Sequence, residues 1–214
     1  MVKLNKIYTR TGDGGSTGLV DGSRTSKSDP LIAAIGDVDE ANSAIGMAIA
    51  AMGGAALGDT RHAHLKALLT VIQNDLFDLG ADLATPAIAA SEDNTDGDAA
   101  DPFAPSEMVL RVTAAQVARL EREIDAMNED LAPLRSFILP GGTPAAAALH
   151  LARAITRRAE RTAVAAGEAP QCPRALNPAA LTYLNRLSDH LFVMTRLVNA
   201  SADGDVLWVP GGSR

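Results

Sequence analysis

One segment of the sequence carries an unusual row of arginines. In HLARAITRRAER, residues 150–161, Arg153, Arg157 and Arg161 follow one another at four-residue spacing, and Glu160 stands beside them. On a helix these three guanidinium groups lie within about 80° of one another, and each like-charged pair costs roughly a few tenths of a kcal/mol. One explanation is a solvated face neutralised by Glu160 and other carboxylates. The other is an anion site, because guanidinium groups match phosphate oxygens and stay charged at every relevant pH.

The N-terminal segment has the residue types that a phosphate site also needs. KIYTRTGDGGSTGL, residues 6–19, contains four glycines together with threonine and serine hydroxyls. Glycines allow backbone N–H groups to approach an anion closely, and hydroxyls add further donors. The segment lacks the Gly-Lys-Ser/Thr ending of a Walker A loop. A disordered polar tail is therefore the alternative to a loop that closes over a ligand.

Two further polar residues stand out in helical patterns. Asp39 lies about 40° from Ile35 on the edge of an apolar stripe, where an unpaired carboxylate is costly. Asn185 lies within the leucine pattern of TYLNRLSDHLF. Either residue can also be read as an exposed polar side chain. The histidines show no Glu-x-x-His spacing and Cys172 is the single cysteine, so we expect no dedicated protein metal site and no internal disulfide.

Five amphipathic helices are predicted to position these residues. Apolar residues recur at three- and four-residue spacing in five segments, and low aromatic content with abundant alanine favours helices over strands. Asp29-Pro30, Thr143-Pro144 and Asn177-Pro178 each combine an N-cap residue with proline at the first helical position. No segment predicts a strand convincingly. The expected helices cover about residues 30–52, 65–83, 109–127, 144–166 and 178–197.

These patterns predict an all-α, five-helix up-and-down bundle in a single domain, residues 1–214. The acidic segment 86–106, rich in small and turn residues, is expected to form a long exposed loop. The net charge of −7 argues against a nucleic-acid-binding protein. No apolar run reaches the roughly 20 residues of a membrane span, and the N-terminus has no apolar signal core. A cytoplasmic protein is therefore expected.

Together these segments resemble the PduO-type ATP:cob(I)alamin adenosyltransferases. The resemblance rests on KIYTRTGDGGSTGL, VDEANSAIG, FILPGG, RAITRRAER and LNRLSDHLF, and on Trp208-Val209-Pro210-Gly211 near the end of the chain. It covers essentially the whole sequence in the same order. The sequence departs from the family in the acidic loop 86–106, and in Arg10, where lysine is common.

The resemblance implies a homotrimer of five-helix bundles with an active site between neighbouring subunits. Residues 1–28 would form a mobile loop that becomes ordered over ATP. Asp39 would pair with Arg153 across the subunit boundary, and Phe137 would line the corrinoid pocket. Arg157, Arg161 and Phe137 would serve catalysis. The implied ATP-binding residues are Thr9, Arg10, Thr11, Gly12, Ser16, Thr17, Lys27, Arg157, Arg158, Glu160, Arg161 and Asn185.

The implied reaction transfers the 5′-deoxyadenosyl group of ATP to the cobalt of cob(I)alamin, or of cob(I)yrinic acid a,c-diamide, and releases triphosphate. Mg²⁺ would arrive with ATP, and Phe137 would displace the lower ligand of cob(II)alamin so that it is reduced more easily. A flavin reductase and an adenosylcobalamin-dependent mutase are the implied partners. Two alternatives remain open: a non-catalytic ATP- or corrinoid-binding sensor or chaperone on the same bundle, and a structural bundle with a solvated arginine face.

Overall fold

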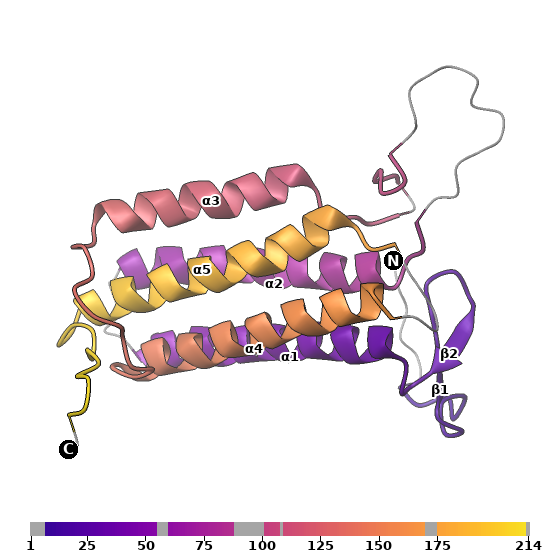
Figure 1. Cartoon of the computed structure of the whole chain (residues 1–214), viewed down its shortest axis with the longest axis horizontal. Helices are drawn as coiled ribbons and strands as arrows, with labels where there is room; N and C mark the ends of the chain where they lie inside the picture. The colour runs from indigo at the N-terminus through magenta and orange to yellow at the C-terminus, as the bar shows by residue number, and fades with distance from the viewer. Residues whose placement is uncertain (1–6, 55–59, 88–100, 108, 170–174, 213–214) are drawn as a thin grey trace.

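The computed structural model describes residues 7–54, 60–87, 101–107, 109–169 and 175–212 (Figure 1). Its long elements are the helices of the predicted bundle, so the all-α expectation is confirmed. A short hairpin precedes the bundle and a short 3-10 helix follows the first helix. The elements are β1 (Ser16–Gly18), β2 (Arg24–Ser26), α1 (Pro30–Ala51), η1 (Met52–Gly54), α2 (Thr60–Leu83), α3 (Ala114–Glu129), α4 (Pro144–Gly167) and α5 (Pro178–Ala200).

The helices lie side by side along one long axis. α1 packs against α2 and α4, α4 packs against α5, and α5 packs against α3. The hairpin lies beyond the end of the bundle at which α1 begins, and the segment that follows α5 lies at the opposite end (Figure 1). Among the described residues, none of the helices is both long and apolar enough to cross a membrane.

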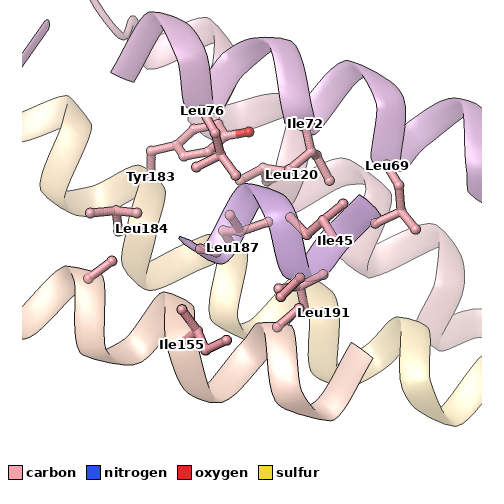
Figure 2. Packing of buried hydrophobic residues seen from close by; sticks show 14 of the residues in the cluster. Ile45, Leu69, Ile72, Leu76, Leu120, Ile155, Tyr183, Leu184, Leu187 and Leu191 are labelled. Atoms are coloured by element: carbon pink, nitrogen blue, oxygen red, sulfur yellow. The ribbon is translucent and has the colours of Figure 1, made fainter. Parts of the chain in front are cut away.

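The core is built from the apolar stripes that the sequence predicts. Large side chains from α1, α2, α3, α4 and α5 contribute to it, and replacing one of them with alanine in such a core costs about 2–5 kcal/mol. Figure 2 shows this packing, in which Ile45, Leu69, Ile72, Leu76, Leu120, Tyr183, Leu187 and Leu191 are almost fully buried.

The three predicted cap-and-proline pairs begin helices as expected. The Asp29 carboxylate accepts a hydrogen bond from the Leu31 N–H (2.9 Å), the Thr143 hydroxyl accepts from the Ala146 N–H (3.1 Å), and the Asn177 side-chain Oδ1 accepts from the Ala179 N–H (3.0 Å). Each cap satisfies a donor that the first turn of a helix leaves unpaired. α1, α4 and α5 therefore begin where the sequence places them.

Two boundaries and one element differ from the sequence prediction. α3 begins at Ala114 and not near 109, because Thr113 and Gln116 form a capping box there and residues 109–113 are not helical. α2 begins at Thr60, ahead of the apolar pattern. The expectation of no strand is wrong for the hairpin, in which β1 and β2 pair antiparallel, with Thr17 opposite Thr25.

A buried polar cluster joins the end of α2 to the start of α5. Asp82 accepts from the Arg111 Nη1 (2.7 Å), from the Val112 N–H (2.8 Å) and from the Asn177 Nδ2 (2.7 Å). Arg111 also donates to the carbonyl oxygens of residues 85 and 86. We call Asp82, Arg111 and Asn177 the Asp82 cluster. It fixes both ends of the predicted acidic loop, of which residues 88–100 lie outside the described residues.

A second polar cluster fixes α3 against α2 and α5. The Asp75 carboxylate accepts from the buried Tyr183 hydroxyl (2.7 Å) and from Gln116 Nε2 (3.0 Å), and it pairs with Arg119. Burial and the neighbouring Asp75 charge raise the pKa of the Tyr183 hydroxyl, so it stays a donor. These contacts orient α5, which carries Asn185.

Candidate active site

The N-terminal loop folds around an arginine that the sequence analysis did not single out. The Arg24 Nη2 donates to the Thr11 carbonyl (2.8 Å), the Ser16 carbonyl (3.2 Å) and the Ser16 hydroxyl (2.7 Å). Arg24 begins β2, so the hairpin places its guanidinium across residues 11–16. A single arginine in a turn-rich segment gives no sequence signal for this role.

Several predicted ATP-binding residues gather in this loop. The Thr9 and Thr11 hydroxyls lie 2.8 Å apart, and the Lys27 N–H donates to the Gly15 carbonyl (2.8 Å). A side chain at Gly12 would meet the Lys27 ammonium at 3.2 Å. One turn-rich segment therefore brings together hydroxyl groups, the Lys27 ammonium group and a glycine backbone that leaves little room for a side chain. These are the groups that a polyphosphate site requires.

Arg10 has an unusual backbone conformation within the same loop. Its φ is +63°, a left-handed conformation that is uncommon for residues with a side chain. Its guanidinium lies over the Tyr8 ring, 5.8 Å from the centroid. Such strain is typical of sites where the surrounding structure fixes one conformation for a function.

A second group of predicted residues lies on the exposed face that α4 and α5 share. The Asn185 Nδ2 donates to the Glu160 carboxylate (2.9 Å), and the Arg161 Nη1 donates to the Arg157 carbonyl (2.8 Å). Arg157 and Arg161 are exposed. Two guanidinium groups, a carboxylate and an amide thus share one surface. This arrangement is compatible with a solvated charged face and with an anion-binding site.

Arg158, also predicted to bind ATP, faces α1 of its own chain. Its Nε donates to the Asp37 carboxylate (3.0 Å) and its Nη2 to Glu40. The Thr162 hydroxyl donates to the other Asp37 oxygen (2.9 Å). In this chain Arg158 therefore holds α4 against α1 through two carboxylates.

Phe137 lies next to the segment that follows α5, at the rim of a pocket of about 620 Å³. Its ring is 77 % exposed and meets Trp208 edge to face, with centroids 5.9 Å apart. An aromatic ring so poorly covered by its own chain is available for a ligand. The pocket is lined by Leu134, Arg135, Ser136, Phe137, Ile138, His150, Arg153, Phe192, Trp208 and Pro210.

Backbone hydrogen bonds hold Phe137 against the C-terminal segment. The Trp208 N–H donates to the Phe137 carbonyl and the Leu139 N–H to the Val206 carbonyl, both at 2.8 Å. The turn that follows is fixed by Asn199, whose side chain accepts from the Thr143 N–H (3.1 Å) and donates to the Gly141 carbonyl (3.2 Å). At Gly142, with φ +96°, a side chain would collide with Asn199.

Asp39 and Arg153, the predicted ion pair, do not meet within this chain. Asp39 is exposed, and no hydrogen bond or ion pair of its carboxylate occurs among the described residues. Arg153 lies over the Phe192 ring at 6.0 Å from its centroid, and its buried Nε has no hydrogen-bond partner among the described residues. Burial and the neighbouring Arg157 charge lower the pKa of Arg153.

The predicted site residues therefore form three separate groups. The N-terminal loop lies beyond one end of the bundle and the arginine face lies along α4 and α5. The segment that follows α5 lies at the opposite end (Figure 1), and Phe137 is hydrogen-bonded to that segment. Within residues 7–212 as described, no hydrogen bond or ion pair links the loop to Arg157, Arg161 or Asn185. The described residues also contain no cluster of three or more His, Cys, Asp or Glu side chains suited to a metal ion.

Comparison with known proteins gives one consistent family. The sequence model described as cobalamin adenosyltransferase matches residues 7–198. The corrinoid adenosyltransferase of Mycobacterium tuberculosis strain H37Rv is 47 % identical over 215 residues, which cover 100 % of this chain and 97 % of the relative. That of Bacillus subtilis strain 168 is 41 % identical over 202 residues, covering 94 % and 91 %.

Solved structures give the same result. A phenylalanine-to-histidine variant of the PduO-type ATP:corrinoid adenosyltransferase from Lactobacillus reuteri, complexed with cobalamin and ATP, matches with a TM-score of 0.74. It is 35 % identical to this chain, and the match covers 95 % of this chain and 96 % of that one. An arginine-to-lysine variant of the same protein, complexed with ATP, matches with the same TM-score and identity.

Proposed function

This chain belongs to the cobalamin adenosyltransferase family, and on that premise we propose that it transfers the 5′-deoxyadenosyl group of ATP to the cobalt of cob(I)alamin. The observation that carries the proposal is the exposed face on α4 and α5, where Arg157 and Arg161 stand beside the hydrogen-bonded Glu160 and Asn185. Two unshielded guanidinium groups at such a surface are matched by a polyphosphate.

The chemistry requires no nucleophile from the protein. Co(I) supplies the electron pair of the new cobalt–carbon bond to the ribose C5′, the C5′–oxygen bond breaks, and triphosphate leaves with the electron pair of that broken bond. The protein must hold C5′ against cobalt and stabilise the charge that builds on the leaving group. Arg157 and Arg161 serve the second task, and the donors of the N-terminal loop, Thr9, Arg10, Thr11, Gly12, Ser16, Thr17 and Lys27, serve the first.

Arg158 has a different share in the proposed site. Its Nε and Nη2 already face Asp37 and Glu40, so in the single chain it positions α4. Glu160 fixes the Asn185 amide, and we assign this pair to the adenosine half of ATP, where a donor and acceptor pair reads hydroxyls and ring nitrogens.

We propose that the complete site forms between subunits of a homotrimer. Among the described residues of one chain, no hydrogen bond or ion pair links the loop to Arg157, Arg161 or Asn185. The Asp39 carboxylate has no hydrogen bond or ion pair there, and the buried Arg153 Nε has no hydrogen-bond partner. Asp39 borders a shallow apolar pocket of about 400 Å³ between α1 and α2, which includes Ile35 and the largely exposed Phe77. A neighbouring α4 on this surface would cover Phe77 and pair its Arg153 with Asp39.

Phe137 is proposed to contact the corrinoid and to favour loss of the lower ligand from cob(II)alamin. The two variants of the Lactobacillus reuteri enzyme change a phenylalanine and an arginine 20 residues apart, and the same spacing separates Phe137 from Arg157. Apolar side chains that line the pocket beside Phe137, among them Leu134, Ile138 and Phe192, would help to keep water from the position that the lower ligand leaves.

The remaining assignments follow from this chemistry. Mg²⁺ is proposed to enter with the triphosphate of ATP. A flavin reductase would supply the electron that converts cob(II)alamin to cob(I)alamin, and an adenosylcobalamin-dependent mutase would consume the product. A cytoplasmic location is proposed as well.

The test is a spectral assay of adenosylcobalamin formation from reduced cobalamin and ATP. We expect Arg157→Ala to lower the rate by about 10²–10³-fold, the usual effect of losing one such donor, with an unchanged unfolding midpoint because Arg157 is exposed. Arg122→Ala, an exposed arginine on α3, is the matched control. Equal rates for the two variants would leave the solvated-face explanation. Binding of both ligands without product by the wild type would instead identify a sensor.

A further inference from the structure

The pocket beside Phe137 contains a buried histidine that the proposed mechanism does not use. His150 lies on α4 and is only 3 % exposed, yet it lines this pocket. Neither its Nδ1 nor its Nε2 has a hydrogen-bond partner among the described residues. A buried polar group without a partner is rare in native proteins and costs stability, so an occupant of the pocket is the expected explanation.

A second buried histidine provides the internal comparison. His190 on α5 is fully buried, and its Nε2 lies 2.8 Å from the Glu123 carboxylate. A core histidine of this fold thus has a partner for at least one ring nitrogen. His150 differs in that both of its nitrogens are unused and it borders a pocket. A purely structural role explains His190 and leaves His150 unexplained.

The surroundings of His150 select the chemistry of the occupant. The other pocket side chains are mostly apolar, and the charged ones are Arg135 and Arg153. Arg153, one turn along α4, and Asp205 of the C-terminal segment are the charges that act on the His150 imidazole. Burial and the Arg153 charge lower the pKa of His150. A neutral imidazole carries one donor and one acceptor, which is the complement of a primary amide.

Resting on the proposed function, we propose that His150 recognises the corrinoid by a hydrogen bond to one of the primary amides on the edge of the corrin ring. The buried Arg153 Nε, which also lacks a partner, lies in the same pocket wall. Apolar walls with a few convergent polar groups are the usual form of a small-molecule site. His150 is therefore a specificity residue for amidated corrinoids, and Phe137 keeps its proposed contact with the corrinoid.

The binding test uses Trp208, the single tryptophan of the chain, which lines the same pocket. Its fluorescence is titrated with cobyric acid, whose edge is mainly amidated, and with cobyrinic acid, whose edge carries carboxylates. Both corrinoids lack the lower base, so they differ only in these edge groups. We expect His150→Leu to weaken cobyric acid binding by about 5–10-fold, the loss of one hydrogen bond, and to change cobyrinic acid binding by less than about twofold.

Two further variants locate the bond. His150→Asn and His150→Gln place an amide near the Nδ1 and Nε2 positions respectively, and we expect one of them to keep the preference for cobyric acid. They also keep the test valid if His150→Leu does not fold. His64→Asn, at an exposed histidine of α2, is the control. At saturating corrinoid the kcat of the variants and their KM for ATP should stay within about twofold of wild type.

Three outcomes overturn the proposal: an unchanged preference in all His150 variants, an equal loss for both corrinoids, or an equal loss of ATP and corrinoid affinity with a lowered unfolding midpoint. A wild-type protein that binds neither corrinoid would overturn the proposed function itself. The two failures are therefore distinguishable in one titration series.

Discussion

The Asp82 cluster gives the most quantitative expectation of this structure. The side chains of Asp82 and Arg111 are each only 1 % exposed. The Asp82 carboxylate accepts hydrogen bonds from three different donors. Asp82→Ala leaves the Arg111 charge buried without its carboxylate, and it also removes a partner from the Val112 N–H and the Asn177 amide. Breaking a buried ion pair in this way costs about 3–5 kcal/mol. We therefore expect a loss of about 4 kcal/mol in the free energy of unfolding.

Urea unfolding followed by circular dichroism measures this loss. With a slope near 3 kcal/mol/M, the midpoint should fall by about 1.3 M, at one fixed chain concentration because assembly contributes to apparent stability. Asp130→Ala is the matched control. Asp130 pairs with Arg61, but their side chains are 60 % and 48 % exposed, so we expect a loss of about 0.5 kcal/mol or less.

A double variant shows how much of the lost stability comes from leaving one charge unpaired and how much from lost packing. Asp82→Asn combined with Arg111→Met removes both charges, so no unpaired charge stays buried, and we expect it to be more stable than Arg111→Met alone. If Asp82→Ala shifts the midpoint no more than Asp130→Ala does, the buried pair is not the stabilising contact that the structure indicates.

Four further predictions follow. Phe137→Ala should impair adenosylation most when the reaction starts from cob(II)alamin and a reductant, and an equal loss from chemically prepared cob(I)alamin would contradict its proposed role. Arg24→Gln should raise the KM for ATP about 10-fold without changing the KM for cobalamin, because it releases residues 11–16; Arg24→Lys should recover part of the loss, and equal effects on both substrates would exclude this role. The pKa of His150 in the folded protein lies below the ordinary 6.5, because the imidazole is buried and next to Arg153. Protonation therefore favours the unfolded chain, so the free energy of unfolding falls as the pH drops below about 6.5. In urea titrations the wild type should lose more stability than His150→Leu between pH 7.5 and about 5.5, and parallel profiles would refute the burial argument. Gly142→Ala should cost about 2 kcal/mol or more, since it adds a strained φ and a collision with a buried amide; an unchanged melting temperature would contradict this.

The helices were predictable because each has a long apolar stripe, and three of them have explicit cap-and-proline starts. The start of α3 was missed because Val109, Leu110 and Val112 continue its apolar pattern, although Thr113 and Gln116 spell the capping box that the structure uses. The hairpin was missed because its strands are three residues long and carry no alternating apolar pattern. Only Asp21-Gly22, whose glycine has φ +82°, signalled its turn.

The candidate site was predictable only in part. The arginine row and the glycine-rich loop are local patterns, so the sequence shows them directly. The roles of Arg24 and His150 depend on groups far away in the sequence or on the absence of a partner, which no spacing rule reveals. Arg158 illustrates the same limit: the family resemblance assigns it to ATP together with Arg157, but in the structure it faces Asp37 and Glu40.

The Asp82 cluster has one more consequence. Because Arg111 contacts the carbonyl oxygens of Thr85 and Pro86, the chain leaves and re-enters the bundle at a single point. Connections of very different length can therefore be exchanged there, since doubling such a connection costs only about 0.6 kcal/mol in closure entropy. This makes the α2–α3 junction a natural place to insert a peptide tag or a reporter domain without breaking the helical bundle.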